Sequence, residues 1–142
     1  MTETPWDLAR IRAHVAAHLP LAATMGIEIA VAATEHSRVR LEGSAGVLRP
    51  GGSVAGPVLF AMADLVSYVQ TVMLQQQDLA LTSSLNIHFF RPPMQLPLIA
   101  EASTLRAGRT LLTFDVRIWP EAEGPSKLVA QATAIWTAGS RR

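Results

Sequence analysis

The sequence predicts an α+β fold in which one antiparallel sheet wraps around a single long central helix. Residues 57–74 have the length and apolar character of a buried helix. Strand-like segments lie on both sides of that helix, and no internal repeat or low-complexity segment interrupts them. The 142 residues suit one domain, with an N-terminal helical segment at 1–20 and a tail at 138–142.

The segments before the central helix are expected to form a helix and two strands. Residues 5–18 form the expected helix, which Thr4 can cap and Pro20 can end. Residues 25–33 and 37–42 are expected to be strands, because apolar and polar residues alternate in the second of them. The apolar face of the helix consists of Leu8, Ile11, Val15 and Leu19.

Four strands are expected after the central helix. They cover residues 81–90, 98–106, 111–119 and 127–137. The third alternates most clearly, which is the pattern of a strand with one buried face. That face consists of Leu112, Phe114, Val116 and Ile118.

Composition excludes several classes of function. The net charge of +1 is too small to indicate a nucleic-acid binder. The chain has no cysteine, which excludes disulfides and thiolate metal sites, and its four histidines lack the spacing of metal ligands. We therefore expect neither a metal nor a cofactor.

The distribution of apolar residues predicts a soluble oligomer. The N-terminus lacks the features of a signal peptide, and Asp64 interrupts the longest apolar stretch, residues 57–73, which is also short for a membrane span. We expect a cytoplasmic protein with no membrane partner. Hydrophobic residues make up 49% of the chain and charged residues 16%, so part of the surface is expected to be buried against a second subunit.

Asp64 is the most informative residue of the sequence. It is the one ionisable residue between Pro57 and Tyr68, and its neighbours are apolar. An isolated carboxylate in an apolar environment costs several kcal/mol, on the order of two or more, unless it is paired or protonated. Asp64 is therefore either a general base or nucleophile that faces a substrate cavity, or a structural carboxylate with an arginine partner or on a narrow exposed strip.

The start of the central helix favours the first interpretation. Gly51, Gly52 and Gly56 precede the helix, and Pro57 is expected at its first position. A helix N-terminus presents free N–H groups that can polarise a carbonyl. Asp64 follows about two turns later, so in a dimer it can face the N-terminus of the other chain's helix.

Three segments resemble one known family. Residues 53–64, SVAGPVLFAMAD, resemble the active-site segment of hotdog-fold acyl-CoA thioesterases of the phenylacetate-pathway and hydroxybenzoyl-CoA types, which has the form His-Gly-Gly, several apolar residues, then Leu-Ala-Asp. Residues 81–92, LTSSLNIHFFRP, resemble the next strand of that family. Residues 105–110, LRAGRT, resemble its basic hairpin. The similarity extends in order over residues 25–137.

The resemblance implies a hotdog fold and a homodimer with two interfacial sites, often assembled into a tetramer. It implies hydrolysis of acyl-CoA, with a medium-chain or aromatic acyl group, without a metal. Asp64 matches the catalytic carboxylate, and Gly56 matches the glycine whose N–H polarises the thioester carbonyl from the partner chain. Thr82 matches a hydroxyl that helps to position water in some members.

The sequence also departs from the family's pattern. Ala55 replaces the usual histidine, Arg49 replaces a polar side chain such as asparagine, and Pro57 replaces the second glycine. Arg49 can pair with Asp64, or it can bind a substrate carboxylate or a CoA phosphate. Three further basic residues either bind CoA phosphates or are ordinary solvated charges: Arg91, Arg106 and Arg109.

Two other functions fit the sequence. The first alternative is a non-catalytic hotdog protein that binds acyl-CoA or another apolar ligand. The second is a dehydratase that acts on an acyl thioester, although such a site needs a histidine near its aspartate. His88 is expected to face away from the apolar side of its strand. The remaining histidines are expected to be solvated: His14, His18 and His36.

Overall fold

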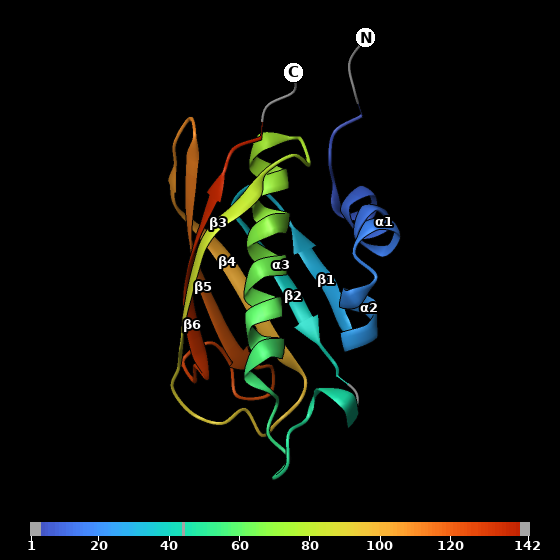
Figure 1. Cartoon of the computed structure of the whole chain (residues 1–142), viewed down its shortest axis with the longest axis vertical. Helices are drawn as coiled ribbons and strands as arrows, with labels where there is room; N and C mark the ends of the chain where they lie inside the picture. Colours follow the sequence, from blue (N-terminus) through green and yellow to red (C-terminus); the bar gives the residue numbers. More distant parts are fainter. Residues whose placement is uncertain (1–3, 44, 140–142) are drawn as a thin grey trace.

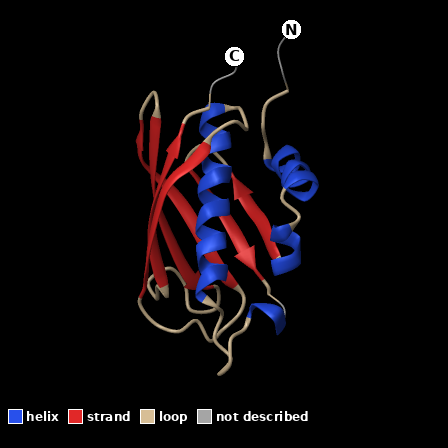
Figure 2. Ribbon diagram, in the orientation of Figure 1, coloured by secondary structure: helices blue, strands red, loops and turns tan. Residues whose placement is uncertain are grey.

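The computed structural model describes residues 4–43 and 45–139. They form one six-stranded antiparallel sheet with strand order β1-β2-β4-β5-β6-β3, and the long helix α3 lies across its concave face (Figures 1 and 2). Figure 1 also shows that α1 and α2 lie beside β1, on the same side of the sheet as α3. This is the hotdog arrangement that the sequence predicts.

The elements follow the predicted order, with one additional short helix. The helices are α1 (Leu8–His18), α2 (Leu21–Met25) and α3 (Gly56–Gln75), and a 3₁₀ turn, η1, covers Ala45–Val47. The strands are β1 (Ile27–Ala32), β2 (His36–Leu41), β3 (Leu81–Phe89), β4 (Leu98–Ala107), β5 (Leu111–Pro120) and β6 (Ala130–Thr137).

The core lies between α3 and the concave face of the sheet. Val58, Met62, Val66 and Val69 of α3 are buried there, as an apolar helix requires. The alternation predicted in β5 is confirmed, because its four apolar residues of one face are all buried. β6 contributes small residues, which let the sheet approach the helix closely: Ala130, Ala132 and Ala134.

The N-terminal helix differs from its prediction at both ends. It begins at Leu8 rather than at residue 5, because the side chain of Asp7, not that of Thr4, caps it by accepting a hydrogen bond from the Arg10 N–H at 2.8 Å. Pro20 does not simply end the helix. It precedes the short helix α2, which ends at Gly26 with φ of 77°.

The start of α3 also differs by one residue. Gly56 occupies the first helical position and Pro57 the second, with Ala55 as the N-cap. Proline is compatible with either position, because the first-turn N–H groups have no partner within the helix. The last strand begins at Ala130 rather than at residue 127, since Lys127 belongs to the turn that follows β5.

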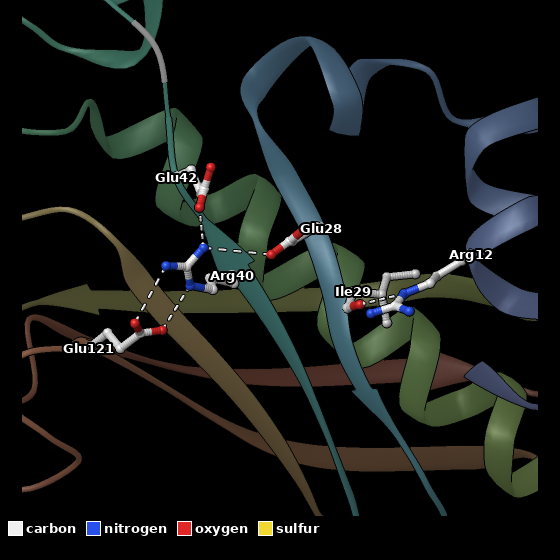
Figure 3. A network of polar contacts seen from close by, with 6 residues as sticks. All are labelled: Arg12, Glu28, Ile29, Arg40, Glu42 and Glu121. Carbon is white, nitrogen blue, oxygen red and sulfur yellow. Dashed lines mark hydrogen bonds and ion pairs between the residues drawn. The ribbon is translucent and has the colours of Figure 1, made fainter. Parts of the chain in front are cut away.

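The two edges of the sheet differ in whether side chains cover them. At the β1 edge, Arg12 of α1 donates a hydrogen bond of 2.9 Å from Nε to the Ile29 carbonyl (Figure 3). Beside it on the convex face, Arg40 of β2 joins three carboxylates (Figure 3), those of Glu28, Glu42 and Glu121. Side chains therefore cover the β1 edge and its convex surface.

The β3 edge has no such cover in the described part of the chain. Leu81, Phe89 and the following Phe90 expose 73%, 53% and 58% of their surfaces. An uncovered apolar edge strand is a typical site for pairing with another strand. The fold thus leaves one open edge, directly beside α3.

Helix α3 also meets the length and composition of a membrane-spanning helix. However, 72% of its apolar window is buried inside the fold. Burial in a core explains its composition, so the helix is weak evidence for a membrane span.

We predict that truncating the core face of β5 destabilises the protein strongly. Phe114 is fully buried, so Phe114→Ala should lower the free energy of unfolding by about 3–5 kcal/mol. Urea denaturation followed by circular dichroism measures this change. Leu105→Ala, at a side chain that is 62% exposed on β4, is the matched control and should cost far less. Equal losses in both variants would contradict this assignment of the core.

Candidate active site

Asp64 lies on the side of α3 that faces the start of β3. Its side chain is partly buried, and its Oδ1 accepts a hydrogen bond of 2.8 Å from the Thr82 hydroxyl. Within the described residues, the Asp64 carboxylate forms no ion pair. Asp64 is therefore not the structural partner of an arginine within one chain. One oxygen is fixed by a neutral hydroxyl, and the other is left to accept a further proton or hydrogen bond.

A register shift in β3 accompanies the Thr82 contact. The pairing of β3 with β6 is irregular between Thr82 and Ser84. A β-bulge adds a residue to one strand, which changes the direction of the neighbouring side chains. This irregularity lies directly beside the residue that contacts Asp64.

Asp64 and Thr82 border an apolar cavity of about 370 Å³. This first cavity lies between the N-terminal helices on one side and α3 with β3 on the other. Its volume is within the range of small-molecule sites. Its apolar walls include Leu21, Met25, Ile27, Leu65, Leu81 and Trp136. A carboxylate at the border of such a cavity can act on a ligand whose apolar part fills it.

A cluster of rings forms another part of this cavity. His14 of α1 and Tyr68 of α3 are hydrogen-bonded, with 2.8 Å between His14 Nε2 and the Tyr68 hydroxyl. Burial lowers the pKa of His14 below 6.5, although the nearby Asp78 carboxylate opposes this shift. Burial also raises the pKa of Tyr68 to about 12. Both shifts favour the neutral form of each group at pH 7, and the tautomer of His14 decides which of the two partners donates the proton.

A second cavity, of about 420 Å³, lies at the N-terminal end of α3. It is lined by Gly56 of α3, by Arg49, and by the residues that end β3, including Phe89 and Arg91. The Gly56 N–H makes no hydrogen bond within the described residues. Together with the helix dipole, this free N–H gives the cavity a donor for an anionic or polarised oxygen.

The two cavities lie at opposite ends of β3. The first contacts Leu81 and Thr82, whereas the second contacts Phe89 and Phe90. Gly56 and Asp64 are eight residues apart on one helix, which is about 12 Å along its axis. A single chain therefore does not bring its carboxylate to its own Gly56 N–H.

Comparison with known proteins identifies the family of this chain. The model of the thioesterase superfamily matches residues 51–127, which include Gly56, Asp64 and Thr82. The chain belongs to the thioesterase superfamily. It is accordingly a hydrolase of thioesters with the hotdog fold.

Individual relatives are consistent with this family. A protein of Saccharolobus solfataricus, provisionally named as an esterase, is 26% identical over 112 residues, covering 79% of this chain and 73% of the relative. A crystal structure from Silicibacter sp. TM1040, of a provisionally assigned thioesterase, is 29% identical with a TM-score of 0.82, covering 95% and 93% of the two chains. A thioesterase from Haemophilus influenzae, at 16% identity, has the same fold with a TM-score of 0.82, covering 94% and 91%.

The arginines of this thioesterase chain lie in different places. Arg49 lies in the second cavity, and within one chain it makes no ion pair with Asp64 or any other described residue. Arg91 borders the same cavity and is bound to Glu123 at 2.6 Å. Arg106 and Arg109 lie at the exposed β4–β5 hairpin, outside both cavities of their own chain. Their role in binding phosphates stays a prediction.

Two residues at the start of α3 shape the thioesterase's second cavity. Ala55 donates its N–H to the Val47 carbonyl at 2.8 Å, which fixes the loop without the histidine that is usual in the family. Pro57 follows Gly56 and has no N–H, so the Gly56 N–H is the exposed donor at this turn.

The histidines differ in exposure, and His14 and His36 are half-buried. His88 and His18 are exposed, as expected. The expectation that His14 is solvated is wrong, because its side chain is only 17% exposed and is bonded to Tyr68. Sequence periodicity missed this pair, since its members are 54 residues apart. Within the ranges 4–43 and 45–139, no cluster of three metal-ligating side chains occurs.

We predict that the thioesterase loses stability in mild acid through His14. The unfolded chain binds a proton at the ordinary histidine pKa of 6.5, whereas burial lowers the pKa in the folded state. The unfolded chain therefore binds more protons as the pH falls through 6.5, and stability decreases there. Urea midpoints at about pH 7.5 and about pH 5.5 measure the loss.

His14→Gln provides the control, because the glutamine amide can donate or accept a hydrogen bond at Tyr68 but does not titrate. The decrease in stability between the two pH values should be smaller in this variant than in the wild type. The same decrease in both proteins would show that His14 does not contribute to it.

Proposed function

We propose that this protein hydrolyses acyl-CoA thioesters with a medium-chain or aromatic acyl group. The observation that carries the proposal is the Asp64 carboxylate, held by the Thr82 hydroxyl at 2.8 Å on the border of an apolar cavity. The acyl group occupies this first cavity, with its thioester carbonyl near Asp64. The CoA portion extends toward the second cavity of a neighbouring copy.

Asp64 acts as a general base or as a nucleophile. As a base, it accepts a proton from water while the water oxygen attacks the thioester carbon. The tetrahedral intermediate collapses, the C–S bond breaks, and the CoA thiolate takes the proton from Asp64, so the products are a thiol and a carboxylic acid that ionises by losing its proton to water. As a nucleophile, the Asp64 carboxylate attacks the thioester carbon, the C–S bond breaks, and CoA leaves as a thiolate that takes a proton from water. Water then hydrolyses the acyl anhydride, which releases the acid and regenerates the Asp64 carboxylate.

The Gly56 N–H of a second copy stabilises the negative charge on the carbonyl oxygen. It is free of other hydrogen bonds and lies at the positive end of the α3 dipole. A preorganised N–H of this kind stabilises the transition state more than the ground state. Because the Gly56 of the same chain is about 12 Å away along the helix, the donor must come from another chain.

Pairing of two β3 edges supplies this geometry. β3 is an open edge with exposed apolar residues at both ends, so an antiparallel pairing of two copies covers it. With the two-fold axis near Leu85, the Leu81 end of one strand meets the Phe89 end of the other. The first cavity of each copy then adjoins the second cavity of the other, and the dimer has two equivalent sites.

The second cavity carries charges that suit CoA. Arg49 has no ion pair within the described residues, and Arg91, which pairs with Glu123 at 2.6 Å, borders the same cavity. Guanidinium groups bind phosphate oxygens through charge-assisted hydrogen bonds. We assign these two arginines to the phosphates of CoA, on the side of the thioester opposite to the acyl group.

We predict that Asp64→Asn lowers the rate of thiol release from acyl-CoA by at least about a hundredfold, the scale of a lost acid–base group. A thiol reagent measures the release over a panel of acyl-CoAs. Asp115→Asn is the matched control, because Asp115 is bonded to Arg117 on the convex face of β5, and it should retain wild-type turnover. Unchanged turnover in Asp64→Asn would remove Asp64 from the mechanism.

We predict that Gly56→Pro, which removes the proposed N–H donor, lowers kcat by about 10²–10³-fold. Ala55 has φ of −65° and ψ of 140°, which suits a residue before proline. Gly56→Ala keeps the N–H, and its Cβ would lie at an ordinary contact distance of 3.5 Å from Phe89. The alanine variant should retain much more activity than the proline variant.

A mixed dimer tests whether one site uses two chains. Chains with Asp64→Asn and chains with Gly56→Pro are coexpressed with different tags and purified as heterodimers. One site of each heterodimer then has an intact Asp64 and an intact Gly56, so turnover should exceed that of either parent by at least about tenfold. No recovery in folded heterodimers would contradict a shared site.

A non-catalytic binding protein gives a different result. It would release no thiol from any thioester, but it would bind acyl-CoA saturably. Isothermal titration of the wild type with an acyl-CoA that is not hydrolysed distinguishes this outcome from a protein that does not recognise CoA.

A further inference from the structure

The floor and the rim of the first cavity differ in exposure. At the rim, Leu21 and Leu81 expose 59% and 73% of their surfaces. At the floor, Leu65, Tyr68 and Trp136 expose 9% or less. A group that enters beside Asp64 therefore passes apolar side chains and reaches an enclosed, largely aromatic end.

Tyr68 is one helical turn beyond Asp64 on the same side of α3. Four residues separate them, which is about 6 Å along the helix axis. His14 of α1 lies against the Tyr68 hydroxyl and closes the space between the two helices. This His14–Tyr68 pair thus lies in the direction that an acyl chain takes away from the carboxylate.

The pair is held in place by three elements of the fold. The Trp6 ring contacts the His14 ring edge-on at 5.1 Å, and the backbone N–H of Trp6 donates to the side-chain oxygen of Gln76, the residue that caps the end of α3, at 2.8 Å. Trp136 of β6 packs against Tyr68 at 5.5 Å. Moving either member of the pair would break contacts on α1, α3 or β6, so the end of the cavity has a fixed position.

The charge state of the pair suits an apolar occupant. Both side chains are neutral at pH 7, and each satisfies the other's polar atom. A methyl group that lies against them does not leave an ion or an unpaired hydroxyl in an apolar environment.

We infer that the His14–Tyr68 pair sets the maximum length of the acyl group, so that these are specificity-determining residues. The inference rests on the proposed function, because it assigns the acyl group to this cavity. Acyl chains that end before the pair are accepted, and longer chains collide with it. The N-terminal helix α1 thereby limits the substrate without contacting the reacting atoms.

The test compares kcat/KM over saturated straight-chain acyl-CoAs from butanoyl-CoA to hexadecanoyl-CoA. His14→Ala opens the end of the cavity, so kcat/KM for the first chain length beyond the wild-type limit should rise about tenfold or more. Ala22→Leu adds volume on the α2 wall of the same cavity and should shorten the limit. His36→Ala, at a residue outside both cavities, should leave the length profile unchanged.

Folding and turnover are checked separately, so that the possible failures can be distinguished. Circular dichroism and gel filtration establish that each variant is folded and has the wild-type assembly state. If the wild type turns over acyl-CoA and both folded variants, His14→Ala and Ala22→Leu, keep the wild-type length profile, the length limit is overturned. The proposed function would then stay intact.

The absence of wild-type turnover with every acyl-CoA would reject the proposed hydrolysis. In that case, the length limit is tested by binding instead. The dissociation constants of acyl-CoA thioether analogues of different chain lengths are measured for the wild type and for His14→Ala. If the analogue that His14→Ala binds most tightly is longer than the one that the wild type binds most tightly, the pair limits the length of the acyl group that binds. The same preferred length in wild type and His14→Ala rejects it.

Discussion

The packing of α3 against the curved sheet determines where the groups of the candidate site lie. The helix is apolar on nearly all sides, and its residues from Val58 to Met73 are mostly enclosed. Because six antiparallel strands curve around it, the helix fixes the position of every side chain on its remaining surface. Asp64 lies on that surface, between the core and the open β3 edge. The packing of the core therefore positions its backbone, and the Thr82 hydroxyl orients its side chain.

The same helix serves two different chemical purposes along its length. Its first turn presents a free N–H and a positive dipole end, and its third turn presents a carboxylate. These groups are too far apart to act together on one carbonyl in one chain, yet both lie next to the uncovered strand. In the proposed dimer, each helix contributes its N-terminus to one site and its carboxylate to the other. The open edge is then part of the site's construction rather than a defect of the sheet.

The sequence predicted the fold and the location of Asp64 on the central helix well, because both depend on local patterns, whereas the catalytic role of Asp64 stays a prediction. The run 57–74 lies within the observed Gly56–Gln75, and the alternation of β5 is confirmed. The errors occur where two neighbouring residues compete for one role or where a contact spans the chain. Thr4 and Asp7 are both capping residues, and only the structure shows that Asp7 accepts the bond. His14 looked solvated, because its partner Tyr68 is remote in sequence.

Residues 8–25 form an appendage to the sheet rather than part of it. They supply the outer wall of the first cavity, whereas the carboxylate, the hydroxyl and the Gly56 N–H all come from α3 and β3. The part that matches the superfamily, residues 51–127, likewise excludes this appendage. In the proposed function, the N-terminal helices thus contribute to selectivity together with Tyr68 of α3, but they supply none of the reacting groups. Under that proposal, substitutions within residues 8–25 can reshape the acyl-binding wall while Asp64, Thr82 and Gly56 keep their positions.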